Sequence, residues 1–529
     1  MYRLVQRRGI IGLFCLLFVA SSVVPGWAQK DNRFEVSKNL DIFNSLLKEV
    51  EMFYVDSVDV DKTVQRGIEA MLAGLDPYTE YYPEQKTEEL SLMTTGEYGG
   101  IGSLIRQRNN EGGVMIAEPT EGMPADLAGL KPGDLILAID TIDVSKATNS
   151  RVSELLKGVP NTKMVLTIQR PGEKKPRKFE ITRKQITTPQ VTYYGVKNDS
   201  IGYIYLKAFT IKSAQEVKEA FLDLKKNHNI KSLVLDLRGN GGGVLEGAVQ
   251  IVGMFVPKGS EVLSTKGKIK QWDRAVLVGQ RSFGKGLVQA PRDLPYNGKV
   301  KITMSKYYIP SGRCIQQIDY SHRKEDGSVA AIPDSLTSVF YTSKKRPVRD
   351  GGGVRPEFEV KEPKVPTMMY YLAADTVLFD FVTDWVQKHK TIAPIEEFTV
   401  SDEDFEALKQ YAKSKNFTYD RQSEKVLKNL KEVAEFEGYL EEDSTAFKEL
   451  EAKLTPNLEK DFDRFKDEVK RVMAAEIVKR YYYQRGELQE SLKDDLVLEK
   501  ALEVLGDPDL YRRTLSVPVE LEAATKGTE

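Results

Sequence analysis

Hydrophobic residues recur three and four positions apart at both ends of the chain, which is the spacing that gives a helix one apolar face. Residues 30–95 show it in FNSLLKEVEMF and KTVQRGIEAMLAGL, up to LDPYTEYYP, where a loop is predicted from Leu75. Residues 366–529 show the same spacing of hydrophobic residues, with many charged residues between them. One apolar stripe is predicted there, formed by Phe462, Phe465, Val469, Val472, Ile477 and Tyr481. Both ends are therefore predicted to be helical.

The middle of the chain has two other patterns. In residues 96–186 apolar and polar residues alternate in GVMIAEP, DLILAID and KMVLTIQR, with Gly/Pro turns between them, which predicts a small β domain. Residues 187–200 are predicted to be a polar connector. From Ile201 on, IGYIYLKAF and SLVLDL predict strands, while SAQEVKEAFLDLKKNH and VLEGAVQIVGMFV predict helices. The fold class is therefore multidomain α/β (α+β), with an α/β core in residues 187–365.

The first 28 residues have the three parts of a secretory signal. Arg3, Arg7 and Arg8 precede an apolar run, GIIGLFCLLFVA, and the small residues Gly26 and Ala28 follow it. A membrane anchor is the alternative, but the run is too short to span a bilayer. Residues 1–28 are predicted to be a signal peptide and the protein to be exported.

Charge and residue counts narrow the possible chemistry. The chain has 529 residues, with 77 Lys and Arg against 78 Asp and Glu, so it lacks the basic surplus typical of nucleic-acid binding. Its length suits three or four folded units. Three histidines and, without the signal, the single Cys314 suffice for neither a zinc site nor an internal disulfide. No metal or cofactor is predicted.

The glycine-rich stretch GEYGGIGSLI opens the predicted β domain. Around Gly100, Ile101 and Gly102, backbone N–H groups can converge on a small anion, and an open strand edge beside them can add a peptide as a further strand. Both features suit capture of a peptide's C-terminal carboxylate. The later stretch EGMPADLAGLKPGDLILAIDTIDV resembles the signature of PDZ domains. The alternative is that these glycines only make tight turns.

The segment SLVLDLRGNGGGVLEGAV runs from a predicted strand through a glycine turn into a helix. Backbone N–H groups at such a junction can stabilise a developing oxyanion, which makes Gly241 and Gly242 oxyanion-hole candidates. Phosphate binding is disfavoured, because Gly243 is followed by Val244 and Leu245 where a P-loop needs Lys and Ser or Thr. A plain turn is the remaining alternative.

The segment GQRSFGKGLVQ places Lys285 between two glycines, after the predicted strand AVLVG. A lysine held with little solvent gives up its charge more readily and can then take a proton from a hydroxyl group. Lys285 is therefore a candidate general base. The alternative is an ordinary solvated lysine in a loop.

Seven motifs in order resemble the C-terminal processing (tail-specific) serine peptidases over about residues 35–365. They are LDPYTEYY, GEYGGIG, the PDZ signature, LDLRGNGGG, RSFGKG, MSKYYIPSGRCIQ and GGGVRPEFEV. The resemblance implies a helical N-terminal part, a PDZ domain that holds the substrate's C-terminus, and an α/β protease core with a serine nucleophile and a lysine base.

Residue by residue, the resemblance makes Lys285 the general base. It places Gly241 and Gly242 in the oxyanion-hole loop, and Gly100, Ile101 and Gly102 in the loop that binds the tail. It also implies protein or peptide substrates and, with the signal, a bacterial periplasm or cell envelope. Self-association is expected through the helical C-terminal region.

The chain departs from the family at the nucleophile. The family carries its serine in a Ser-rich turn after a buried strand and before a helix, and no such segment is found here. Nine residues separate the predicted strands 260–265 and 275–279, whereas parallel neighbours need a crossover of about a dozen or more. A βα unit is therefore predicted to be missing between Trp272 and Asp273.

No other residue is identified as a nucleophile. Ser282 and Lys285 have a Ser-x-x-Lys spacing, but Gly284 and Gly286 predict a loop where that arrangement requires a helix. A structural role is predicted for Ser282, and Cys314 is predicted to be a packed small residue. Two functions stay open: a peptidase whose nucleophile segment is absent from this sequence, and a catalytically inactive PDZ scaffold that binds tails.

Overall fold

The computed structural model describes residues 32–108, 112–260, 262, 275–309, 311–324, 327–342, 344–361, 363–420, 422–439, 444–454 and 457–516. The predicted signal peptide, the point between Trp272 and Asp273 and most of the predicted strand 260–265 lie outside these residues. The chain divides into two compact units, Met1–Tyr81 and Tyr82–Glu529. None of the described helices is long and apolar enough to cross a membrane.

The first unit contains the two helices that the N-terminal pattern predicts, α2 (Arg33–Phe53) and α3 (Val60–Ala73). Asp59 caps α3, because its carboxylate accepts the backbone N–H of Lys62 at 3.0 Å. After α3, Asp76 accepts the N–H groups of Tyr78 and Thr79, both at 2.8 Å. This turn ends the helical region in LDPYT, as predicted, and the short strand β1 (Glu80–Tyr82) follows.

The second unit begins with short helices and a β domain. Its sheet has the order β3-β4-β5-β7-β8, with β6 beside β5, and β2 pairs separately with β9. The predicted strands GVMIAEP, DLILAID and KMVLTIQR are confirmed as β4, β5 and β7. The elements are η1 (Glu84–Lys86), α4 (Thr87–Thr95), β2 (Glu97–Gly100), β3 (Ser103–Gln107), β4 (Val114–Pro119), α5 (Pro124–Leu127), β5 (Leu135–Ile139), β6 (Ile142–Asp143), α6 (Asn149–Leu156), β7 (Lys163–Gln169), β8 (Arg177–Thr182) and β9 (Lys184–Thr187).

The α/β core has a sheet of three strands, β10 (Val191–Lys197), β11 (Ile201–Leu206) and β12 (Ser232–Asp236). β11 pairs antiparallel with β10 and parallel with β12. The helices α7 (Ser213–Asn227) and α8 (Leu245–Gly253) are the two predicted ones. The prediction of a connector over 187–200 is wrong, because VTYYGVK is rich in the β-branched and aromatic residues that favour strands and forms β10.

The core sheet ends at β12. Among the described residues no strand pairs with its second edge, and β13 (Val278–Gly279) pairs with β20 (Phe358–Glu359) instead. The strand predicted over 275–279 is therefore only two residues long. The strands that follow are β14 (Leu287–Asp293), β15 (Lys299–Lys306), β16 (Ile318–Arg323), β17 (Val329–Ala331), β18 (Val339–Tyr341) and β19 (Pro347–Arg349), with η2 (Asp334–Leu336) between β17 and β18.

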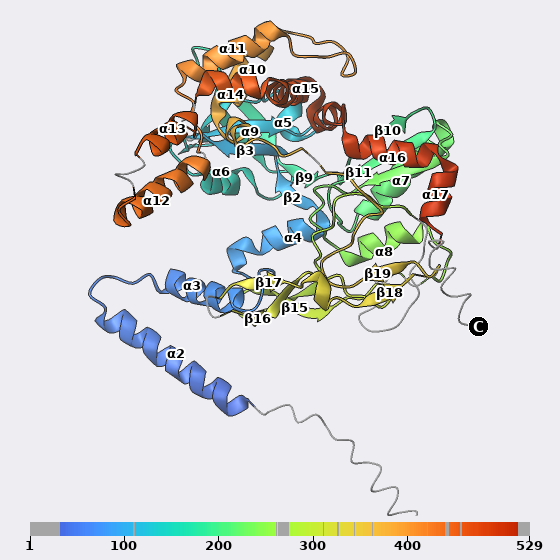
Figure 1. Ribbon diagram of the computed structural model, residues 1–529. Coiled ribbons are helices and arrows are strands. Elements are labelled where there is room, and N and C mark those ends of the chain that lie inside the picture. The colour runs from blue at the N-terminus through green and yellow to red at the C-terminus, as the bar shows by residue number, and fades with distance from the viewer. Residues whose placement is uncertain are drawn as a thin grey trace, which may run out of the picture. The chain divides into compact units, whose positions relative to one another are not determined.

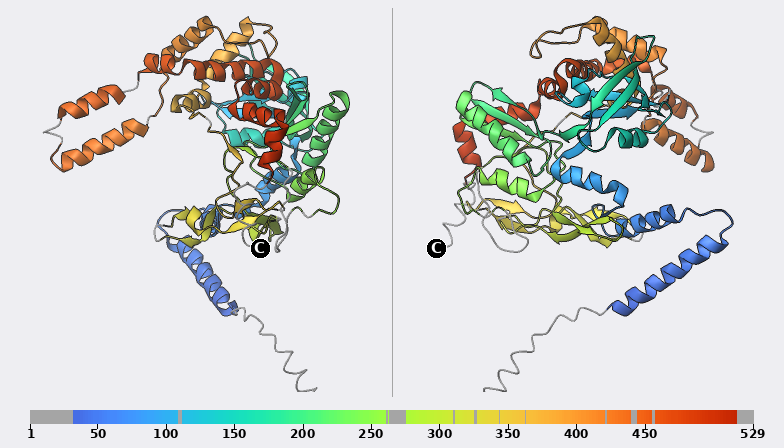
Figure 2. Two further views of the ribbon diagram at one scale, coloured as in Figure 1. Left: turned by 45° about the vertical axis from the view of Figure 1, so that its right-hand side comes forward. Right: turned by 180° about the vertical axis from the view of Figure 1, so that it is seen from behind.

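The described part of the C-terminal region is helical, as predicted (Figure 1). It has its own hydrophobic core. Phe462, Val469 and Ile477 of the predicted stripe are fully buried there, and the other three stripe residues pack against them. α12 and α13 form a hairpin that projects from the other helices (Figure 2). The helices are α9 (Thr367–Ala374), α10 (Thr376–Lys388), α11 (Asp402–Ser414), α12 (Gln422–Phe436), α13 (Ser444–Leu454), α14 (Leu458–Arg464), α15 (Lys466–Ser491), α16 (Leu496–Gly506) and α17 (Pro508–Thr514).

Candidate functional site

The predicted tail-binding residues form the turn between β2 and β3. The carbonyl of Ile101 accepts the N–H of Ala125 at 2.8 Å, and that of Gly102 accepts the N–H of Thr120 at 3.0 Å. The N–H groups of Ile101 and Gly102, in contrast, donate to no acceptor within the described ranges. Gly100 lies opposite Lys184 in the β2–β9 ladder. The turn is thus held by its carbonyls and leaves two adjacent donors available.

Close backbone approach accounts for the glycines of this turn. A Cβ on Gly99 would lie 2.1 Å from the carbonyl oxygen of Gly158, and one on Gly102 would lie 2.5 Å from Cβ of Met123. Gly102 also has a positive φ of 69°, which favours glycine. These glycines are therefore needed for the tight turn itself. The same turn also leaves the N–H groups of Ile101 and Gly102 available.

β3 and α6 lie side by side next to this turn. β3 is an edge strand of its sheet, so a peptide can pair with its second edge. At one end of α6, Gln107 Oε1 accepts the N–H of Asn149 at 2.7 Å. At the other end, Arg183 donates to the carbonyls of Leu155 and Leu156 at 2.8 and 3.2 Å. The helix is therefore fixed at both ends beside an unpaired strand edge.

The glycine turn after β12 is anchored to the end of β11. Asn240 Nδ2 donates to the carbonyl of Leu206 at 3.0 Å, and its Oδ1 accepts the N–H of Gly242 at 2.8 Å. A Cβ on Gly243 would lie 1.9 Å from the carbonyl oxygen of Phe209. Gly241 is the exception, because its N–H has no acceptor in the described part of the chain and a Cβ there would meet nothing within 4 Å. Of the two oxyanion-hole candidates, Gly241 has the available donor.

A buried charged network lies directly before this turn. Asp236 is 7% exposed and pairs with Arg238, with Nη2 and Oδ2 2.6 Å apart. Burial opposes ionisation of Asp236, but the Arg238 guanidinium outweighs that cost and lowers the pKa of the carboxyl below its ordinary 3.8. The hydroxyl of buried Tyr203 donates to the same carboxylate at 2.7 Å. The turn thus begins from a rigid, ionised pair.

The loop that carries Lys285 is clamped on both sides. The carbonyl of Gly284 accepts the N–H of Gln317 at 2.8 Å, and the hydroxyl of Tyr307 donates to the carbonyl of Lys285 at 2.8 Å. A Cβ on Gly284 would lie 2.8 Å from the backbone nitrogen of Gly353. The Lys285 side chain is half-buried. Three motifs that are separate in the sequence, RSFGKG, SGRCIQ and GGGV, therefore meet around the candidate base.

Ser282 and Cys314 have structural contacts in this loop. Ser282 Oγ accepts the N–H of Val354 at 2.8 Å, and its backbone N–H donates to the carbonyl of Val354 at 2.9 Å. These bonds support the structural role predicted for Ser282. Cys314 is a free thiol whose Sγ lies 3.1 Å from the position of a Cβ on Gly286, as expected for a packed small residue.

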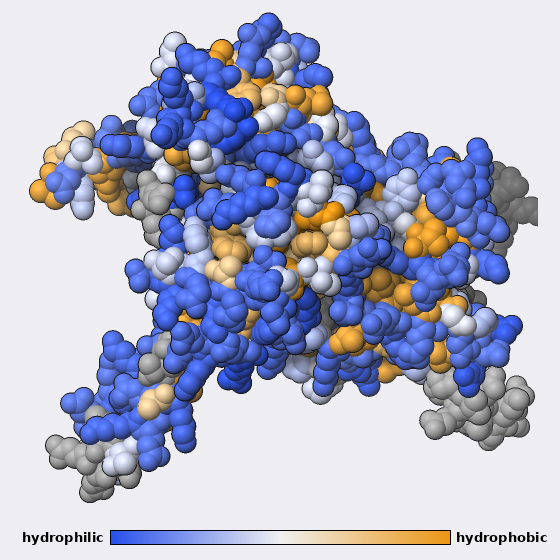
Figure 3. Space-filling view, turned by 90° about the horizontal axis from the view of Figure 1, so that it is seen from above, coloured by the Kyte–Doolittle hydropathy of each residue, from blue (hydrophilic) through white to orange (hydrophobic). Residues whose placement is uncertain are grey.

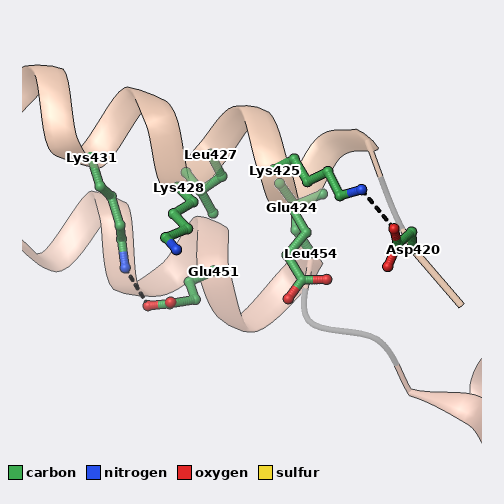
Figure 4. A pocket seen from close by; sticks show the side chains of 8 residues that line it. All are labelled: Asp420, Glu424, Lys425, Leu427, Lys428, Lys431, Glu451 and Leu454. Atoms are coloured by element: carbon green, nitrogen blue, oxygen red, sulfur yellow. Dashed lines mark hydrogen bonds and ion pairs between the residues drawn. The ribbon is translucent and has the colours of Figure 1, made fainter. Parts of the chain in front are cut away.

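A surface pocket lies elsewhere, between α12 and α13 (Figure 4). Two of its lysines are paired, Lys431 with Glu451 at 2.5 Å and Lys425 with Asp420 at 2.6 Å. No residue of the motifs described above lines it. Among the side chains that the structure describes, no group of three or more His, Cys, Asp or Glu could hold a metal ion.

Fold and site together define a class of protein: a peptide-binding β domain joined to an α/β core with a candidate lysine base. The family profiles agree with this class. Residues 115–170 match the PDZ domain, residues 200–269 and 260–321 match peptidase family S41, and residues 368–505 match the C-terminal helical domain of probable PDZ-proteases.

Two relatives place the chain more closely. The carboxy-terminal-processing protease of Bartonella bacilliformis is 31% identical over 345 positions, which cover 57% of this chain and 77% of the relative. A probable CtpA-like serine protease of Staphylococcus aureus is 28% identical over 317 positions, which cover 52% of this chain and 62% of that protein. The chain belongs to the C-terminal processing (tail-specific) serine peptidase family.

Both alignments are longer than the part of this chain that they cover. Of 529 residues, 57% is about 302, which is about 43 fewer than 345. For the staphylococcal relative, 52% is about 275, which is about 42 fewer than 317. About forty positions in each alignment are therefore residues of the relative that face a gap in this chain.

Solved structures give weaker matches. The photosystem II D1 C-terminal processing protease is 23% identical, with a TM-score of 0.28, over 61% of this chain and 87% of that one. The PDZ domain of a Vibrio cholerae carboxy-terminal protease, in complex with a peptide, is 26% identical, with a TM-score of 0.17, over 17% of this chain and 99% of that one.

Proposed function

We propose that the protein is a serine endopeptidase of the bacterial periplasm or cell envelope, which captures protein C-termini with its PDZ domain and cuts by a Ser–Lys mechanism. The clamped loop around Lys285 is the observation that carries the proposal, because three separate motifs meet to hold one lysine. The nucleophile belongs to a segment that this chain lacks, so we propose no cleavage by the chain as given.

Each residue of the candidate site has a role in this proposal. The N–H groups of Ile101 and Gly102 receive the tail carboxylate, while the edge of β3 pairs with the residues before it. In the protease core, the Lys285 amine takes the proton of the serine hydroxyl as the oxygen attacks the peptide carbonyl. The N–H of Gly241 donates to the oxyanion that forms.

Two independent observations support a missing segment. The relatives have about forty aligned positions with no counterpart in this chain, enough for a strand, a turn and a helix. The second is that no described strand pairs with the second edge of β12 (SLVLD), although β12 is an apolar strand of the kind normally flanked on both sides. A strand in this place would continue the core sheet beyond β12.

A tail-binding scaffold is the second candidate function. The observation that favours it is the second edge of β12, because no described strand pairs with that edge to carry a nucleophile. Both functions share the PDZ site, and they differ only in cleavage.

The intact mass of the mature native protein, with peptide mapping from Thr265 to Gly284, separates the two. A mass above that of residues 29–529 by a strand-and-helix segment identifies a working peptidase. A mass equal to that of the given chain identifies the scaffold. The observed N-terminal residue also tests export, because we expect the signal to end at Ala28.

A graft tests the mechanism. The corresponding segment of the Bartonella relative, inserted between Trp272 and Asp273, is expected to produce cleavage of a substrate with an apolar C-terminal tail. Lys285→Ala in the grafted chain should lower kcat by a factor of about 10³ or more. Lys306→Ala, which changes an exposed lysine of β15, is the matched control. Equal cleavage by the Lys285 and Lys306 variants would exclude Lys285 as the base.

A further inference from the structure

We propose that Asp495, at the start of α16, is a positioning residue for the glycine turn 239–243 and acts through Arg238. The C-terminal helical domain would then contribute to the geometry of the protease site through this contact with Arg238. This inference rests on the proposed function insofar as the turn supplies the oxyanion donor.

Arg238 is held by two carboxylates that come from different domains. Its Nε and Nη2 reach Asp236, at 3.0 and 2.6 Å from Oδ2. Its Nη1 and Nη2 reach Asp495, at 2.9 Å from Oδ1 and 2.7 Å from Oδ2. A guanidinium shared in this way has its donors directed to both sides, which fixes its plane. Asp495 therefore supplies half of the anchoring of Arg238.

Asp495 is itself held rigidly. Its Oδ1 accepts the N–H groups of Val497 and Leu498, both at 2.9 Å, so the same carboxylate caps α16. Its side chain is 9% exposed. Leu492 and Leu498, on either side of it, pack against Tyr203 of β11. The carboxylate is thus presented to Arg238 by a capped helix that packs on the core sheet.

Arg238 directly precedes the turn and controls how it leaves β12. Its backbone N–H donates to Oδ1 of Asp236 at 2.9 Å, which bends the chain at the strand end. Beyond it, Asn240 is anchored to Leu206 at the end of β11 and Gly243 pairs with Phe209 just after that strand, while Gly241 has no anchor of its own among the described residues. The position of the Gly241 N–H therefore depends on the fixed ends of the turn, one of which is Arg238.

Native-state amide exchange of the full chain tests this with a matched pair of helix caps. Asp495→Asn keeps a good N-cap but removes the charge that Arg238 binds. Asp507→Asn does the same at α17, where Asp507 accepts the N–H groups of Asp509 and Leu510 at 3.0 and 2.9 Å. We expect exchange of the hydrogen-bonded amides within 239–244, those of Asn240, Gly242 and Val244, to accelerate roughly ten- to hundredfold in Asp495→Asn. Asp507→Asn should leave these amides unchanged.

A role limited to capping would give a different result. In that case Asp495→Asn would change exchange in α16 alone, and unchanged exchange in 239–244 would overturn the proposal. If Asp495→Asn lowers protection throughout the core, Asp495→Glu is the second variant, since a carboxylate that still reaches Arg238 should restore protection of 239–244. Failure of that rescue would also overturn it. Binding of a tail peptide to the PDZ domain tests the proposed function separately, because neither substitution touches that domain.

Discussion

The PDZ sheet and the sheet β10-β11-β12 of the protease core differ in how completely they are enclosed. In the PDZ domain β7 has a strand on each side, and Leu166 and Ile168 are fully buried. In the protease core β12 has a described strand on one side only, and its apolar residues Leu233, Val234 and Leu235 are each only half-buried. Both strands have the composition of buried strands, so the difference lies in what surrounds them.

This difference shows which part of the function the chain can support alone. The PDZ domain closes its core with its own residues, and its unpaired strand edges belong to the outer strands β3 and β8. In the protease core, no described strand pairs with the second edge of β12, although β12 has the apolar composition of a central strand. In the proposed function, tail binding accordingly relies on described residues alone, whereas cleavage relies on a further segment.

Truncation of one leucine in each sheet is expected to have the largest effect on this comparison. Leu166→Ala should lower the stability of the PDZ domain by about 2–5 kcal/mol, the usual cost of a cavity in a closed core. Leu235→Ala should lower that of the protease core by about 1 kcal/mol, because a half-buried leucine loses less contact with the interior. Native-state amide exchange reports both regions separately in the intact chain.

An equal cost for the two substitutions would break the comparison. It would mean that β12 is enclosed in solution and that another segment covers its edge. The natural protein would then have a complete core, and the intact mass should show the extra residues.

The PDZ sheet could be predicted from the sequence because its signals are local. Alternation in KMVLTIQR specifies β7, and the turn residues around it specify where the strand ends. β10 was missed because VTYYGVK lies between polar stretches and its partner β11 decides its structure. The contact of Arg238 with Asp495 spans 257 positions, and no local pattern reports such a distance.

The candidate site was predictable to the same extent. Lys285 could be identified because its flanking glycines mark a special loop, and the structure supplies the reason, namely the close approach of Gly353 to Gly284. The distinction between Gly241 and Gly242 could not, because it depends on the side chain of Asn240 taking the N–H of Gly242. Sequence patterns located the turn, and only hydrogen bonds identify its available donor.

The pH dependence of stability should have opposite signs in two places of the second unit. Glu487 lies half-buried beside Lys479, which also pairs with Glu118 of the PDZ domain. Burial raises the pKa of Glu487 above its ordinary 4.5, despite Lys479. The folded state then holds the proton more tightly, so this contribution is full below pH 4.5 and is lost as the pH rises through the raised pKa.

Asp236 in the protease core behaves in the opposite way. Its pKa is lowered below 3.8, so its contribution is present above that pH and is lost as the pH falls through the lowered pKa. Amide exchange from pH 3 to 8 should show both trends. Glu487→Gln is expected to abolish the loss of stability at rising pH, and Asp236→Asn the loss at falling pH. If stability still falls at rising pH in Glu487→Gln, another group causes that loss.

The smallest effect is expected from exposed ion pairs, which occur in both regions. Lys163 and Glu180 pair across β7 and β8 at 2.6 Å, with side chains 70% and 62% exposed. Lys299 pairs with Asp293 across β14 and β15 in the protease core.

Solvent and salt screen such exposed ion pairs, and holding two long side chains in one geometry costs conformational entropy. The face of the molecule seen in Figure 3 is mainly hydrophilic, with separate hydrophobic areas. Lys163→Ala and Lys299→Ala should each leave the thermal unfolding curve unchanged within error, at low and at high salt. A measurable loss confined to one region would mean that its surface charges, and not only its sheet, distinguish it from the other.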